Sequence, residues 1–196
     1  MSEMNPEFDE AYYNHYYHDE DTRVFARECT PRFAKFAFSY LDLMQVPIKS
    51  VCDLGCGLGY WRNYLRTRPE KISYTGVDKS EYACSRFGWI NSTVEEYRPG
   101  RRFDLVICQS VLQYLGDDAI KSAAENIAEI TRKAFLLEVP TEWDFENTLS
   151  SRSDFNVHKR SKQFYLALFA PWFENYGGGL FIKKDFAFYP YDIWRF

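Results

Sequence analysis

The chain has 196 residues, of which 46% are hydrophobic and 27% are charged. This composition is typical of about one globular domain and excludes a disordered chain, a collagen and a coiled coil. The net charge is −4, and the first thirty residues hold eight acids against two arginines, so no positive field attracts a phosphate backbone and no nucleic-acid partner is expected. Aromatic residues make up 19% of the chain, which is enough for a large core, an aromatic-lined pocket, or both.

A helix is predicted first, because Thr30 is a good N-cap, Pro31 suits the first helical position and Pro47 ends the apolar periodicity. Short apolar runs then alternate with helix patterns, which is typical of a parallel sheet covered by helices on both faces. Ser80 is expected to cap one of these helices, and another begins at about residue 117. The predicted strands are 48–54, 72–77, 90–94, 103–108 and 134–139.

The regular alternation stops after residue 140. Residues 141–158 are polar and are predicted to form a loop, and 164–173 has a helical pattern that a proline interrupts. Residues 180–188 and 192–196 are predicted to be antiparallel edge strands. No repeat or linker divides the chain, so we expect a single domain over residues 1–196.

The cysteines indicate free thiols in a reducing compartment. Their number is odd, and their spacing fits neither a disulfide framework nor a zinc site, so no metal is expected. No signal-peptide pattern opens the chain, and no run approaches the ~18 apolar residues of a membrane span. We therefore expect a cytoplasmic protein without a membrane partner. The five cysteines are Cys29, Cys52, Cys56, Cys84 and Cys108.

The most informative segment is the glycine-rich stretch VCDLGCGLG at residues 51–59, which joins a predicted strand to a helix. Open α/β sheets bind ligands at such turns, and glycines let the backbone approach the ligand. The spacing is G-x-G-x-G, and Tyr60 stands where a dinucleotide loop has its third glycine. Asp53 precedes the loop, where its carboxylate would repel a pyrophosphate. These features favour a ligand with an ammonium or sulfonium group.

A second acid ends the second predicted strand. Asp78 lies 23 residues after Gly55, where a carboxylate can accept both hydroxyls of a ribose. With Asp53 and the loop, this arrangement resembles the class I S-adenosylmethionine-dependent methyltransferases, whose first motif is an acid followed by x-G-x-G-x-G. The resemblance covers residues 48–140 well and the remainder by architecture only. It implies a three-layer, Rossmann-like α/β sandwich with a mostly parallel seven-stranded sheet and an antiparallel C-terminal edge pair.

The resemblance also implies a cofactor and the residues that bind it. The cofactor would be S-adenosyl-L-methionine, released as S-adenosyl-L-homocysteine. Asp53 would face the amino group of its methionine part, and Asp78 would hold the ribose. Thr93 stands where the family often has an acid, so the contact of this residue with adenine departs from the family pattern. The implied cofactor-binding residues are Asp53, Gly55, Cys56, Gly57, Asp78, Lys79, Thr93, Val94 and Gln109.

Methyl transfer from a sulfonium is an in-line displacement, so the protein must supply alignment and exclude water. A base is needed only when the acceptor starts protonated. His158, after the fifth strand, is the candidate catalytic base, with Glu138 second; a solvated histidine without a role is the alternative. The acidic N-terminal arm favours a small-molecule acceptor, methylated at O, N or C.

The N-terminal residues 1–30 are a candidate lid, residues 48–140 the cofactor-binding core, and residues 141–196 the substrate-side loops and edge strands. Four tyrosines in the lid could fold over the cofactor, with Arg23 paired to its carboxylate, and their rings would attract a sulfonium. Ordinary packing of these rings is the alternative. The four are Tyr12, Tyr13, Tyr16 and Tyr17.

Two other functions stay open on the sequence alone. One is a nucleotide-dependent oxidoreductase of the NAD type, which the glycine spacing disfavours. The other is a catalytically silent scaffold that keeps the fold to bind an adenosyl ligand or a partner.

Overall fold

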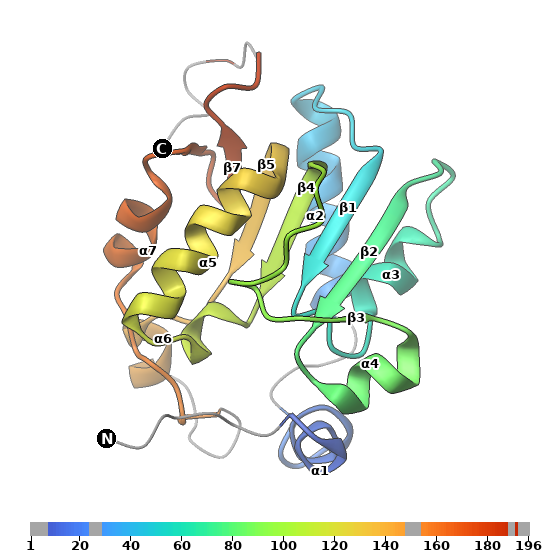
Figure 1. The fold of residues 1–196 in the computed structure, drawn as a ribbon, viewed down its shortest axis with the longest axis vertical. Helices are drawn as coiled ribbons and strands as arrows, with labels where there is room; N and C mark the ends of the chain where they lie inside the picture. The colour runs from blue at the N-terminus through green and yellow to red at the C-terminus, as the bar shows by residue number, and fades with distance from the viewer. Residues whose placement is uncertain (1–7, 24–28, 148–153, 188–190, 192–196) are drawn as a thin grey trace.

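The computed structural model describes residues 8–23, 29–147, 154–187 and 191. Its centre is a seven-stranded sheet in the order β3-β2-β1-β4-β5-β7-β6 (Figure 1). The first five strands pair in parallel, and β7 pairs antiparallel with both β5 and β6. This confirms the predicted fold class. The strands are β1 Ser50–Leu54, β2 Ser73–Asp78, β3 Ile90–Asn91, β4 Phe103–Gln109, β5 Thr131–Glu138, β6 Phe173–Asn175 and β7 Leu180–Lys183.

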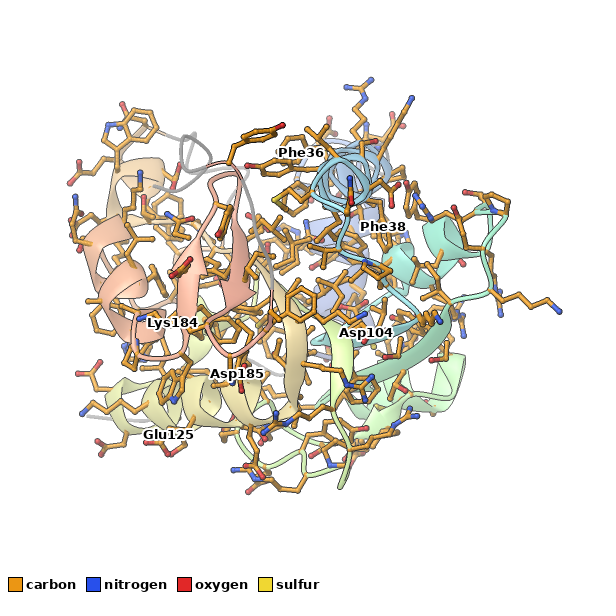
Figure 2. The ribbon with its side chains drawn as sticks, turned by 90° about the horizontal axis from the view of Figure 1, so that it is seen from above. Phe36, Phe38, Asp104, Glu125, Lys184 and Asp185 are labelled. Carbon is orange, nitrogen blue, oxygen red and sulfur yellow. The ribbon has the colours of Figure 1, made fainter. Side chains whose placement is uncertain are left out.

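Helices cover both faces of the sheet. Consecutive residues of β4 point to opposite faces of the sheet. Leu105 packs in the core on the side of α2 and α3, and Val106 packs in the core on the side of α5 and α7. Seen from above, Phe38 of α2 and Glu125 of α5 lie on opposite sides of the sheet (Figure 2). None of the helices in the described ranges is long and apolar enough to cross a membrane. The helices are α1 Glu10–Tyr13, the π-helix η1 Asn14–His18, α2 Cys29–Leu43, α3 Tyr60–Leu65, α4 Glu81–Phe87, the 3-10 turn η2 Leu112–Tyr114, α5 Asp117–Ile130, α6 Glu142–Asn147 and α7 Lys162–Phe169.

Local sequence signals explain the helices α4 and α5. Ser80 caps α4, because its Oγ accepts the N–H of Ala83 at 3.1 Å. In α5 the predicted apolar stripe faces the sheet, and Ile120 and Ile127 are completely buried.

In the C-terminal third, the end of the predicted helix 164–173 is a strand, and the start of the predicted loop is a helix. The partner of β7 is β6, which occupies the end of the predicted helix 164–173, because Phe173 packs against Phe135 and Phe181 in the core. The predicted strand 192–196 lies outside the described residues. In the predicted loop, the carboxylate of Asp144 accepts hydrogen bonds from the N–H and hydroxyl of Thr141, and α6 forms there.

The hairpin between β6 and β7 depends on Gly179. This residue has φ +78°, and a Cβ there would overlap the carbonyl oxygen of Leu137 on β5. Gly179 also accepts the N–H of Leu137 at 2.8 Å, so this contact joins β7 to the rest of the sheet. The close approach of the two backbones requires glycine.

We predict that Gly179→Ala destabilises the chain more than Gly100→Ala, its matched control. Gly100 has φ +66° but open space around it, so its substitution adds only the left-handed cost of about 1–2 kcal/mol. Overlap with Leu137 should add about 1–3 kcal/mol at Gly179. Urea unfolding of both variants measures this difference, and equal losses would contradict the proposed backbone contact.

Candidate functional site

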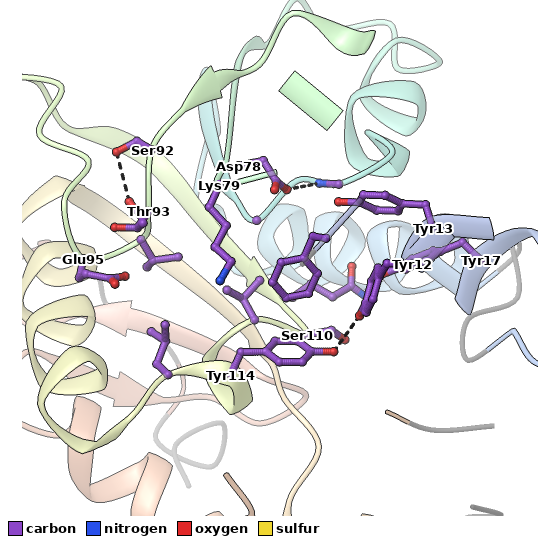
Figure 3. Close-up of a pocket in the computed structure, with 17 residues that line it drawn as sticks. Tyr12, Tyr13, Tyr17, Asp78, Lys79, Ser92, Thr93, Glu95, Ser110 and Tyr114 are labelled. Atoms are coloured by element: carbon purple, nitrogen blue, oxygen red, sulfur yellow. Dashed lines mark hydrogen bonds between the residues drawn. The ribbon is translucent and has the colours of Figure 1, made fainter. Parts of the chain in front are cut away.

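A cavity of about 260 Å³ opens at the C-terminal ends of the parallel strands (Figure 3). This edge of the sheet is where open α/β folds bind ligands. A smaller hollow of about 50 Å³ adjoins the cavity around the same glycine loop. The main cavity is lined by Phe8, Tyr12, Tyr13, Tyr17, Gly55, Gly57, Asp78, Lys79, Ser92, Thr93, Val94, Glu95, Gln109, Ser110, Val111, Tyr114 and Leu115.

The glycine loop lines both hollows, through Gly55 and Gly57. Gly55 and Gly57 have φ of +73° and +46°, in the left-handed region that glycine favours. A Cβ on Gly55 would overlap the side chain of Val111, which lines the cavity from beyond β4. The N–H groups of Gly55 and Cys56 both donate to the carbonyl of Val77, at 2.8 and 3.1 Å. The loop is therefore fixed to β2, and at Gly55 and Gly57 it offers backbone, not side chain, to a ligand.

Asp78 fastens this loop from the end of β2. Its Oδ2 accepts the N–H of Gly57 at 2.7 Å, and its Oδ1 accepts the N–H of Ser80 at 2.9 Å. The residue is only 6% exposed, and burial raises the pKa of its carboxyl, although these two hydrogen bonds oppose the rise. Asp78 lines the cavity, as expected for a ribose-binding acid.

Asp53 lies beneath the loop and lines the smaller hollow together with Cys56. The hydroxyl of Tyr74 donates to its Oδ2 at 2.7 Å. Burial, with a smaller contribution from the charge of Asp78, raises the pKa of the Asp53 carboxyl to about 7, although the Tyr74 hydrogen bond opposes the rise. The acid before the glycine loop is therefore a buried group that titrates near neutral pH.

Gln109, at the end of β4, lines both hollows. Its Oε1 accepts the indole N–H of Trp61 at 2.7 Å, which fixes the amide against the start of α3. The structure thus brings Gln109 to the glycine loop, where the sequence predicted it.

Polar atoms without partners mark the far end of the cavity. Thr93 and Val94 both line it, and the Oγ1 of Thr93 is buried without a hydrogen-bond partner among the described residues. The same holds for one carboxylate oxygen of Glu95, a lining residue that the sequence analysis missed. Glu95 is an acid two positions after Thr93. Lys79 completes this end, with its Nζ 4.8 Å from the centre of the Phe8 ring.

Buried polar atoms need partners, and these fit the edge of an adenine, which carries both donors and acceptors. The left-handed glycines and the buried Asp78 fit the remainder of an adenosyl ligand. The residues present therefore suit S-adenosylmethionine.

The N-terminal segment forms an aromatic wall. Tyr12, Tyr13 and Tyr17 line the cavity, whereas Tyr16 and Arg23 are not among its lining residues. Tyr13 stacks on Tyr82 of α4 with ring centres 5.6 Å apart, and Tyr12 hydrogen-bonds across the cavity to Tyr114 at 2.8 Å (Figure 3). Three of the four tyrosines thus form one wall of the cavity.

The two candidate bases differ in how they contact the cavity. His158 is not a lining residue: its N–H donates to the carbonyl of Gln113 at 2.8 Å. Glu138 reaches the cavity wall through Ser110, whose hydroxyl donates to its Oε2 at 2.7 Å. Ser110 also donates its N–H to the carbonyl of Glu138 and has φ +55°, which is strained for a residue other than glycine. Glu138, itself not a lining residue, therefore contacts the cavity through Ser110, whereas His158 contacts Gln113, which does not line it.

The pKa of Asp53 predicts a decline in stability with rising pH. Its ordinary value of 3.8 is raised to about 7 in the fold, so its contribution is full below about pH 4 and is lost as the pH rises through 7. Asp53→Asn stays neutral. We expect the unfolding free energy of the wild type, relative to this variant, to fall by about 1–3 kcal/mol between about pH 4.5 and about pH 7.5. Urea titrations at the two values measure it, and parallel changes in both proteins would contradict the raised pKa.

Comparison with known proteins agrees with this geometry. The curated malonyl-[acyl-carrier protein] O-methyltransferase of Acetivibrio thermocellus is 32% identical over 95 residues, which are 42% of this chain and 34% of that protein. Nodulation protein S of Rhizobium tropici is 28% identical over 87 residues, which are 40% of this chain and 37% of that protein. The matches span little more than a third of these relatives.

Solved structures show the same fold. The N-methyltransferase NodS from Bradyrhizobium japonicum WM9, in complex with S-adenosyl-L-homocysteine, has a TM-score of 0.55 at 13% identity over 78% of this chain and 88% of that chain. The plantazolicin methyltransferase BpumL, in complex with SAH, has a TM-score of 0.61 at 16% identity over 71% and 62%. A family described as a methyltransferase domain matches residues 16–177. The chain therefore belongs to the methyltransferase domain family, which confirms the resemblance found in its sequence.

Proposed function

We propose that this chain binds S-adenosyl-L-methionine and transfers its methyl group to a small-molecule acceptor at O, N or C. The observation that carries the proposal is the glycine loop, which Asp78 fastens by its hydrogen bond to the N–H of Gly57 at the floor of the cavity. A carboxylate in this position can bind the ribose hydroxyls, while the glycines leave room for the methionine part of the cofactor.

Each predicted cofactor residue has a role in this proposal. The ribose hydroxyls bond to Asp78, and adenine lies between Lys79 and the Thr93–Glu95 segment, whose buried oxygens it would partner. Gly55 and Gly57 lie against the methionine part. Asp53 pairs with the amino group of this part, in the smaller hollow that Cys56 and Gln109 also line.

The bound cofactor supplies an activated methyl group on a sulfonium. The chain's own residues then have to orient the two reactants and keep water out. The aromatic wall serves the second task, since Tyr12 closes across the cavity onto Tyr114.

Glu138 is our preferred proton acceptor where the methyl acceptor carries a proton. Burial raises the pKa of its carboxyl, while hydrogen bonds from Ser110 and Gln109 oppose the rise. A base with a raised pKa is better matched to neutral pH. Ser110 would accept the proton in the cavity and pass its own hydroxyl proton to Glu138. His158 is not a lining residue of the cavity.

We also propose a cytoplasmic location and no nucleic-acid partner. The five cysteines are free thiols, which suits a reducing compartment, and the net charge is negative.

We predict that S-adenosyl-L-homocysteine stabilises the chain. At 100 times its dissociation constant it should add about 2.7 kcal/mol, which for this size is a rise of about 5–10 °C in Tm. A thermal-shift series with SAH, S-adenosylmethionine and NAD(H) measures this. A rise with NAD(H) alone would favour the oxidoreductase, and the absence of any rise would contradict adenosyl binding.

Asp78→Ala should weaken SAH binding about tenfold or more, because it removes charged hydrogen bonds to the ribose. Asp78→Asn is the matched variant of similar size, which removes the charge and keeps one acceptor oxygen for the N–H groups of Gly57 and Ser80. Isothermal titration of both variants gives the affinities, with the unfolding temperature of each as the check on folding. Unchanged affinity in both would show that Asp78 does not bind the ribose.

Glu138→Gln should lower methyl transfer about 100-fold or more and leave SAH affinity within about twofold. Radiolabelled S-adenosylmethionine with a panel of amines, phenols and carboxylic acids provides the assay. The same assay on His158→Asn tests the sequence-based candidate: loss there, with full activity in Glu138→Gln, would assign the base to His158.

A further inference from the structure

The two hollows of the site meet at a small set of shared residues. Of the aromatic residues that line the main cavity from the N-terminal segment, Tyr17 is the one that also lines the smaller hollow. Phe8, Tyr12 and Tyr13 border the main cavity alone. The residues common to both hollows are Tyr17, Gly55, Gly57, Gln109 and Ser110.

If the proposed function holds, this junction is where the sulfur of the cofactor would lie. In S-adenosylmethionine the sulfur is the atom that joins the adenosyl part to the methionine part. A cofactor with its adenosyl part in the main cavity and its methionine part in the smaller hollow must therefore have its sulfur near the junction. We propose that Tyr17 faces the sulfonium there and makes the site prefer the charged S-adenosylmethionine over its neutral product, S-adenosylhomocysteine.

The surroundings of Tyr17 suit a cation. Its phenol lies within electrostatic reach of Asp78 and Glu138, two carboxylates at the ends of different strands. Burial and these charges raise the pKa of Tyr17 well above its ordinary value, so the residue stays a neutral phenol. A neutral aromatic ring attracts a nearby cation through its quadrupole.

Neighbouring rings pack against Tyr17. Its ring centre lies 5.5 Å from that of Tyr13, which itself stacks on Tyr82 of α4. Tyr16, one position earlier on the same π-helix, packs on Tyr12 and His15 and is not a lining residue. It is therefore a matched control on the same short segment.

The test compares two affinities in the 196-residue chain. Isothermal titration with S-adenosylmethionine and with S-adenosylhomocysteine gives the ratio of their dissociation constants for the wild type, Tyr17→Leu, Tyr17→Phe and Tyr16→Leu. We expect Tyr17→Leu to reduce the preference for S-adenosylmethionine about two- to thirtyfold, the range of a cation–ring contact. Tyr17→Phe keeps the ring and should keep the preference, as should Tyr16→Leu.

A second series covers the case in which Tyr17→Leu does not fold. Replacing Tyr17 by phenylalanines with increasing fluorination keeps the shape of the ring and weakens its quadrupole, so the preference should fall stepwise. An unchanged ratio, or equal losses for both ligands, overturns the proposal. If the wild type binds neither ligand, the proposed function itself has failed.

Discussion

The geometry of the site depends on the hydrogen bond between the Asp78 carboxylate and the N–H of Gly57. It joins the end of β2 to the loop after β1, two segments 21 residues apart in the chain. The same carboxylate accepts the N–H of Ser80, which caps α4, so one buried acid orients a strand end, a loop and a helix. Because a buried charge without partners is costly, this arrangement favours one conformation of the three segments.

The sequence predicted this part of the molecule because its signals are local. A few neighbouring residues are enough to predict the glycine loop, the helix cap at Ser80 and the apolar strands. Asp53, Asp78 and Gln109, which the family resemblance selected, each line a hollow beside this loop. Their roles toward a cofactor remain proposals.

The remainder could not be predicted because its causes are tertiary. The short strand β6 forms where Phe173 enters a cluster with Phe135, Phe169 and Phe181, contacts that no local pattern reveals. Ser110 has a left-handed backbone conformation that a serine in the sequence does not indicate. Two hydrogen bonds to Glu138 hold it in that conformation. The position of His158 outside the cavity depends on how residues after β5 fold back onto Gln113.

The hydrogen-bonded tyrosines also have a fixed direction. Tyr114 has a single hydroxyl proton and donates it to the carboxylate of Asp154 at 3.1 Å. In its bond with Tyr12, Tyr114 can then act only as the acceptor, so the proton of Tyr12 is already committed. The oxygen of Tyr12 has only lone pairs left for any third molecule. A compound that hydrogen-bonds to this phenol must therefore bring its own N–H or O–H, and one that ends in bare carboxylate oxygens gains nothing there.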